Sequence, residues 1–175
     1  MFTPRLLFLY GPPAVGKLTV ARAIAQREPF KILHNHLTID PVAEVLPFGS
    51  VAFWGVVRRF RRDLIAAAAD DGIDVVYTYV FAPDDAQRVA DIVAPYEERG
   101  GVVSFVQLRA PRAVLLQRVM GEDRKRHGKI TDPETLARLL DEYDNFPALA
   151  HPNSQTIDLD ATSAADAADE ILRRL

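Results

Sequence analysis

The sequence predicts an α/β protein in which helices cover both faces of a parallel β-sheet. Strand-like and helix-like segments alternate along the 175 residues, and such alternation is typical of parallel strands joined by right-handed helical crossovers. A loop that contains two glycines, G-P-P-A-V-G-K at residues 11–17, lies between the first strand and the first helix. The length fits one domain, so residues 1–175 are expected to form a single unit.

The first half of the chain reads as two strands and three helices followed by a third strand. Apolar residues predict strands over 5–10 and, more weakly, 30–35, and helical patterns cover 17–27, 41–46 and 51–69. The short helix is closed by Pro47 and Gly49, and the long one by the polar turn at 70–72. The β-branched and aromatic run over 73–80 predicts a buried strand.

The second half continues the alternation. A helix over 84–99 begins after Pro83 and stops at Gly100 and Gly101, and a strand follows over 102–108. Helices are expected over 111–120 and 133–149, the second with Thr131 and Asp132 as capping candidates. The last strand is expected over 156–159 and the last helix over 164–175.

The loop at residues 11–17 fits the phosphate-binding pattern G-x-x-x-x-G-K in its usual context of strand, loop and helix. Its glycines allow backbone N–H groups to point at phosphate oxygens, and the helix N-terminus adds partial positive charge. Lys17 would supply a cation to the outer phosphates. The alternative is a tight turn with a surface lysine. The predicted phosphate-binding residues are Gly11, Pro12, Pro13, Ala14, Val15, Gly16, Lys17, Leu18 and Thr19.

A hydroxyl that usually binds Mg²⁺ directly is absent after the lysine, because Leu18 stands there and Thr19 comes one residue later. The strand over 73–80 also lacks the acidic residue that many nucleotide hydrolases carry there; Tyr77, Thr78 and Tyr79 occupy its end. Both departures weigh against a switch-type or motor protein that hydrolyses nucleotides.

Polar residues after the second strand predict an acceptor site. Asp40 could be a catalytic base that orients an acceptor hydroxyl and takes its proton, or it could cap the helix that Pro41 begins. Asn35 and His36 are expected to bind the substrate by hydrogen bonds. His34 and His36 would share one side of an extended strand, but no third metal ligand lies near them in the sequence.

Basic residues appear in two further segments. On the long helix, the spacing brings Arg58, Arg61 and Arg62 to one side, and Arg58 is the one assigned to the substrate. The basic loop over 121–129 has glycines near both ends and predicts a mobile lid, about residues 121–131, in which Arg124 is catalytic. A solvated run of charges is the alternative for this loop.

Together these motifs resemble those of small P-loop kinases of the adenylate, shikimate and gluconate kinase type, most closely chloramphenicol phosphotransferase-like proteins. The likeness rests on the loop at 11–17, on D-P-V-A-E-V-L-P at 40–47, on L-L-Q-R at 115–118 with Arg124, and on I-D-L-D-A-T-S at 157–163.

That resemblance implies a three-layer P-loop NTPase fold, with a five-stranded sheet in the order 2-3-1-4-5 and a short lid. It implies ATP and Mg²⁺ as cofactors, the metal being held through water near Thr19 and Asp40. It also implies that Asp40 is the base, that Arg118 and Arg124 are lid arginines, and that Thr162 lies along the adenine.

Composition limits the partners. The net charge of −3 and pI near 5.8 give no general attraction to nucleic acid or membranes, and the chain has no cysteine.

The expected function is cytoplasmic transfer of the ATP γ-phosphate to a hydroxyl of a small molecule, a metabolite or an antibiotic. The alternatives are a nucleotide-binding regulatory or interaction protein without transfer, or a kinase of nucleoside monophosphates or polynucleotides. Monomer and dimer both stay open.

Overall fold

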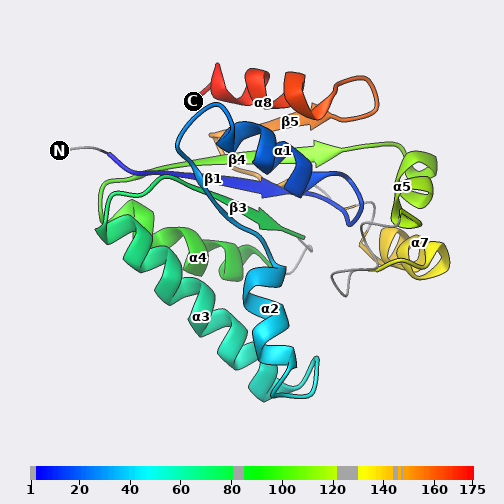
Figure 1. Cartoon of the computed structure of the whole chain (residues 1–175), viewed down its shortest axis with the longest axis horizontal. Helices are drawn as coiled ribbons and strands as arrows, with labels where there is room; N and C mark the ends of the chain where they lie inside the picture. Colours follow the sequence, from blue (N-terminus) through cyan, green and yellow to red (C-terminus); the bar gives the residue numbers. More distant parts are fainter. Residues whose placement is uncertain (1–2, 81–84, 122–129, 144–145, 147) are drawn as a thin grey trace.

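Five parallel strands form one sheet in the computed structural model of the chain (Figure 1). The structure describes residues 3–80, 85–121, 130–143, 146 and 148–175. The strand order β2-β3-β1-β4-β5 confirms the order implied by the resemblance. The strands are β1 Arg5–Tyr10, β2 Lys31–Leu33, β3 Val75–Tyr79, β4 Val102–Arg109 and β5 Ser154–Asp158.

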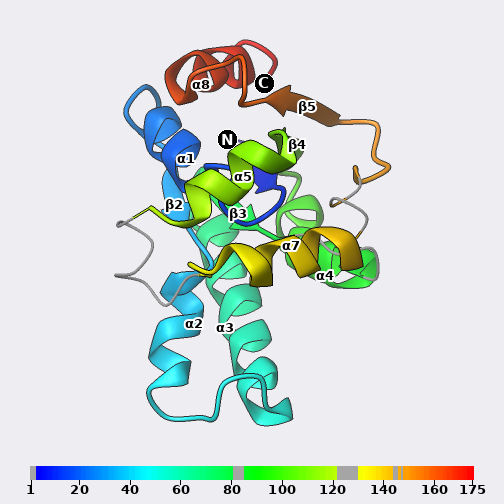
Figure 2. The ribbon, with the colours of Figure 1, turned by 90° about the vertical axis from the view of Figure 1, so that its right-hand side faces the viewer.

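Helices cover both faces of this sheet, as predicted, with α1 and α8 on one face and α3 and α4 on the other (Figures 1 and 2). No helix in the described part of the chain is both long and apolar enough to span a membrane. The described helices are α1 Lys17–Ala25, α2 His36–Ala43, α3 Val51–Asp70, α4 Ala86–Glu98, α5 Arg112–Val119, α7 Pro133–Glu142 and α8 Ala164–Leu172.

The central strand β1 is apolar throughout because both of its faces are buried. Leu7 packs in a cluster with Ile24 of α1 and Ile171 of α8, whereas Phe8 belongs to the opposite cluster with Ile65 of α3. Successive side chains of a strand point to opposite faces, so a strand covered on both sides needs a continuous apolar run rather than an alternating one. The core therefore consists of two layers separated by the sheet.

Helix α2 differs most from its prediction over 41–46. It spans His36–Ala43 and contains Pro41, so Asp40 lies inside the helix, and the prediction of Asp40 as its cap is wrong. Thr38 and Val42 are buried where α2 packs on α3. The burial of this face offsets the hydrogen bond that a proline removes from a helix interior, a loss worth about 3 kcal/mol.

Helix α7 is shorter than the predicted 133–149. It begins as expected, with the Asp132 carboxylate accepting hydrogen bonds from the backbone N–H groups of Glu134 and Thr135, but it ends at Glu142. Phe146 has a left-handed backbone (φ 59°) and is 2% exposed. Helix α7 therefore ends before Phe146, whose ring is buried in the same core cluster as Leu136 and Leu140 of that helix. The other described ends differ from prediction by only a few residues.

Candidate active site

The loop between β1 and α1 has the backbone conformation that its glycines permit. Gly11, Ala14 and Gly16 have positive φ values of 143°, 67° and 109°. A Cβ atom on Gly11 would lie 2.3 Å from the carbonyl oxygen of Leu108, so no other residue fits there without movement of the backbone. The loop is therefore fixed against the neighbouring strand β4 at its first residue.

Lys17 is the first residue of α1, and its side chain turns back over the loop. Its Nζ donates hydrogen bonds to the carbonyl oxygens of Gly11 and Pro12, at 2.8 and 2.7 Å. The N-cap residue Gly16 offers no side-chain hydrogen bond, and the first turn of α1 contains no acidic residue. An ammonium group and the first N–H groups of a helix thus converge on one loop, which is an arrangement that attracts anions.

Arg118 of α5 joins the loop to the turn between β5 and α8. Its two terminal nitrogens donate to the carbonyl oxygens of Val15, at 3.3 Å, and Leu159, at 2.9 Å. Thr162 follows in the same turn, and Ser163 is the residue that caps α8. The structure thus brings Arg118 to the phosphate loop. Arg124 and the rest of the predicted lid, residues 122–129, lie outside the described residues.

His36 and Asp40 form a pair on α2. The Nδ1 atom of His36 lies 2.9 Å from the Oδ1 atom of Asp40, one helical turn away. Because β2 ends at Leu33, His34 and His36 do not share the side of a strand, and that prediction is wrong. The described residues contain no group of three His, Cys, Asp or Glu side chains that could hold a metal ion.

Arg61 is a site residue that the sequence did not single out. It is 6% exposed, and its Nε donates to the hydroxyl of Thr38 at 2.9 Å. Its Nη2 atom and the Tyr77 hydroxyl are buried without a hydrogen-bond partner among the described residues, as is Oδ1 of Asn35. Burial raises the pKa of Tyr77 to about 12, against the opposing effect of the Arg61 charge. The hydrophobic pattern of α3 marks position 61 as inward-facing, and that signal could have found it.

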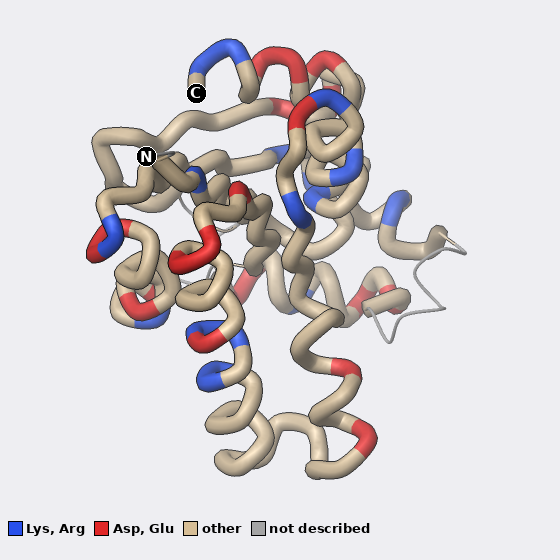
Figure 3. Tube along the Cα trace, turned by 60° about the vertical axis from the view of Figure 1, so that its left-hand side comes forward, with Lys and Arg blue, Asp and Glu red and all other residues tan. Residues whose placement is uncertain are grey.

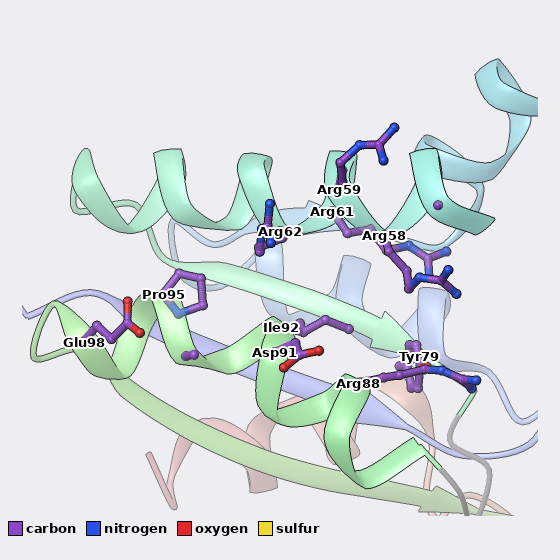
Figure 4. A pocket seen from close by; sticks show the side chains of 12 residues that line it. Arg58, Arg59, Arg61, Arg62, Tyr79, Arg88, Asp91, Ile92, Pro95 and Glu98 are labelled. Atoms are coloured by element: carbon purple, nitrogen blue, oxygen red, sulfur yellow. The ribbon is translucent and has the colours of Figure 1, made fainter. Parts of the chain in front are cut away.

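Arg58 lies in the same cavity as Arg61, between α3 and α4 (Figure 4). The floor of the cavity includes Tyr79, the last residue of β3, which pairs in register with Tyr10 of β1. Tyr10 directly precedes Gly11, so the cavity and the phosphate loop open at the same carboxyl edge of the sheet. Ligands of open α/β sheets bind at that edge.

Thr19 and Asp40, which were expected to lie near a water-held Mg²⁺ ion, are not joined by any contact in the described part of the chain. Thr19 is exposed on α1, and Leu18, which is half-buried, has no oxygen to offer. Asp40 is engaged with His36. As expected, β3 contains no acidic residue; the buried Asp85 comes later and forms an ion pair with Arg88.

In sequence, the chain matches no protein-family model and no curated protein. In structure it is similar to a candidate kinase from Chloroflexus aurantiacus, with TM-score 0.75, 16% identity and 99% of each chain covered. A shikimate kinase from Acinetobacter baumannii in complex with shikimate gives a TM-score of 0.63 at 22% identity, over 98% of this chain and 93% of that one. An APS kinase from Mycobacterium tuberculosis in complex with AMPPNP and APS gives 0.63 at 15% identity, over 98% and 97%.

These neighbours confirm the resemblance drawn from the motifs, at the level of the fold. The sequence identities are too low for a neighbour's substrate to be assigned to this chain, but each structural similarity spans nearly the whole of both chains. The chain therefore has the fold of the small P-loop kinases.

Proposed function

We propose that the chain is an ATP-dependent phosphotransferase that moves the γ-phosphate to a hydroxyl group of a small molecule. The observation that carries this proposal is the loop at residues 11–17, over which the Lys17 ammonium group folds back at the N-terminus of α1. The structural neighbours support it, because one was crystallised with shikimate and another with AMPPNP and APS.

Lys17 would bind the β and γ phosphates of ATP. It now donates to two neutral carbonyl oxygens, and phosphate oxygens would compete well for it because hydrogen bonds between charged groups are about twice as strong. Arg118 would support this site indirectly by holding the turn that carries Thr162 against the loop. The nucleoside part of ATP would then lie along that turn.

Asp40 remains in the proposed catalytic site, and its contact with His36 allows two versions: Asp40 is itself the base, or it orients His36, which is then the base. If Nδ1–H of a neutral His36 donates to Asp40, the Nε2 lone pair is available to accept a proton. The acceptor hydroxyl would lose its proton to this nitrogen as its oxygen bonds to the γ-phosphorus. The bond from that phosphorus to the bridging oxygen breaks, and ADP leaves. Asp40 alone, acting directly on the hydroxyl, is the simpler version.

The residues near the loop do not fit a directly ligated Mg²⁺ ion. Leu18 replaces the usual hydroxyl, Thr19 is exposed, and β3 carries no acid. No step of the proposed transfer is therefore assigned to a metal. The roles above require only the loop, the helix N-terminus and the charged side chains that the structure describes.

The test is ADP production from ATP in the presence of a panel of hydroxyl-bearing metabolites and antibiotics. The proposal expects ADP to form only when an acceptor is present. Tight ATP binding with no acceptor-dependent ADP across the panel would favour the rival function, a nucleotide-binding regulatory protein. The observation that favours this alternative function is that no described residue near the loop is suited to bind Mg²⁺ directly. We expect the activity to be cytoplasmic, in keeping with the absence of cysteine.

A further inference from the structure

A cavity of about 600 Å³ lies between α3 and α4, and its walls are rich in arginine. Arg58, Arg61 and Arg62 line it from α3, and Arg88 lines it from α4, with Tyr79 at the end of β3 (Figure 4). The volume is within the range of small-molecule sites. Figure 4 shows Arg58, Arg61 and Arg88 gathered at the Tyr79 end of the cavity, the end nearest to the phosphate loop.

The acidic residues around the cavity already have partners or lie away from this end. Asp85 is paired with Arg88, and Asp91 accepts a hydrogen bond from the Gln87 side-chain amide at 2.9 Å. Glu98 lies at the opposite end of the cavity (Figure 4). In the part of the chain that the structure describes, neither Arg58 nor Arg61 has an acidic partner, so the described residues at this end of the cavity carry more positive than negative charge.

Arg61 gives the strongest sign of a missing partner. Burial of a charged group is costly unless the group is paired, and buried polar atoms are nearly always hydrogen-bonded. Arg61 donates to the neutral hydroxyl of Thr38 and lies close to Tyr77, and its Nη2 atom has no hydrogen-bond partner among the described residues. The neighbouring Tyr77 hydroxyl likewise has no hydrogen-bond partner among the described residues. An anion bound here would satisfy both groups.

We propose that this cavity binds an anionic group of the acceptor, a phosphate, sulfate or carboxylate, between Arg58 and Arg61. The inference rests on the proposed phosphotransferase function and names its substrate class: a small molecule with both a hydroxyl and an anion. The hydrogen bond from Arg61 to Thr38 ties this guanidinium to α2, the helix that carries His36 and Asp40. A neutral acceptor would leave the buried charge of Arg61 unmet, with the exposed Arg58 beside it, which disfavours such an acceptor.

The first arm of the test compares acceptors in pairs that differ in one anionic group. The pairs are a hydroxy acid with its amide, a sugar phosphate with the free sugar, and a nucleoside monophosphate with its nucleoside. Arg58→Gln is the test variant because its side chain is exposed. Arg59→Gln is its control: Arg59 also lines the cavity, but its guanidinium points away from the Tyr79 end (Figure 4). We expect only the anionic members to be phosphorylated, and Arg58→Gln to raise their KM about tenfold or more while Arg59→Gln does not.

The second arm measures binding of inorganic phosphate, in place of the acceptor, to the wild type and both variants by calorimetry, with the nucleotide site filled by AMPPNP. Binding should weaken about tenfold in Arg58→Gln only. Arg61→Gln, checked for folding by its melting temperature, should weaken it at least as much. Equal phosphate binding in Arg58→Gln and Arg59→Gln would overturn the inference.

The two arms separate this inference from the function on which it rests. Transfer to neutral members, with equal behaviour of Arg58→Gln and Arg59→Gln, contradicts the anionic acceptor but leaves the phosphotransferase intact. Loss of phosphate binding in Arg58→Gln, without transfer to any acceptor, supports the anion site and contradicts the phosphotransferase.

Discussion

Gly11 is the residue at which the backbone most strictly limits the sequence. It has a positive φ, and the space that a side chain would need is filled by the Leu108 carbonyl oxygen, 2.3 Å from the Cβ position. We expect Gly11→Ala to destabilise the protein by about 3 kcal/mol or more, because strain and a clash with backbone act together. Denaturant unfolding measures the loss.

Gly72→Ala is the matched control for this substitution. Gly72 also has a positive φ, 67°, but nothing lies within 4 Å of its Cβ position. Strain alone should cost about 1 kcal/mol there. If both variants lost the same stability, the close approach of β4 to the phosphate loop would not be what requires glycine at position 11.

The contact between His36 and Asp40 predicts that the two residues act as a unit. Asp40→Asn and His36→Gln should each lower turnover about a hundredfold, the range of general base catalysis, and leave ATP affinity unchanged. The double variant should be no slower than either single one, since residues of one catalytic unit are not additive. Turnover and nucleotide binding are measured in parallel.

Glu44→Gln, at the exposed end of the same helix, controls for the change of charge. Loss of turnover in Asp40→Asn alone would mean that the carboxylate acts directly, as the simpler version holds. Full activity of both single variants would contradict both the paired role of His36 and Asp40 and the direct role of Asp40.

The glycines and Lys17 could be predicted from the sequence, because a loop that binds phosphate through its backbone needs those residue types at that spacing. Arg61 could not be singled out in the same way. The buried apolar row of Phe53, Val57 and Ile65 marks position 61 as inward-facing, but the partner of Arg61, Thr38, is met only through the packing of α2 against α3. That contact joins residues 23 positions apart, and local patterns do not report it.

At the scale of elements, helix boundaries depend on which of several polar residues acts as the cap. The sequence offered Asp40 as a candidate cap of α2, and two hydroxyl residues, Thr162 and Ser163, directly precede α8. The structure has a helix running through Asp40, and Ser163 rather than Thr162 accepts the N–H of Asp166. Local rules found the right kind of residue near each end, but the packed face of α2 decided where that helix begins.

Two neighbouring residues in the turn before α8 have different roles: Ser163 caps the helix, and Thr162 is proposed to contact the nucleoside. Ser163→Ala removes the cap and should cost about 1 kcal/mol of unfolding free energy, with ATP affinity unchanged. Thr162→Ala should leave the melting temperature unchanged and weaken ATP binding, because Thr162 is proposed to lie along the nucleoside. Thermal melting and calorimetry with AMPPNP check the two variants. The reverse pattern would contradict both assignments.

At the scale of the whole molecule, the alternation of continuous apolar strands with helices was enough to predict a parallel sheet covered on both faces. The strand order came from the resemblance to P-loop kinases, since periodicity does not say which strands are neighbours. The acceptor cavity could not be predicted, because its two walls, α3 and α4, meet only after the crossover through β3. Figure 3 shows Lys and Arg interspersed with Asp and Glu over the trace of the chain.

The central claim is that this fold transfers phosphate from ATP through the loop around Lys17. The most direct measurement follows the γ-phosphate of labelled ATP in the wild type and in Lys17→Ala, with thermal melting to verify that the variant folds. The account predicts that the label moves to an organic acceptor in the wild type, and that Lys17→Ala reduces this transfer about a hundredfold or more. Near-normal transfer by folded Lys17→Ala, or label that the wild type releases only as inorganic phosphate, would contradict it.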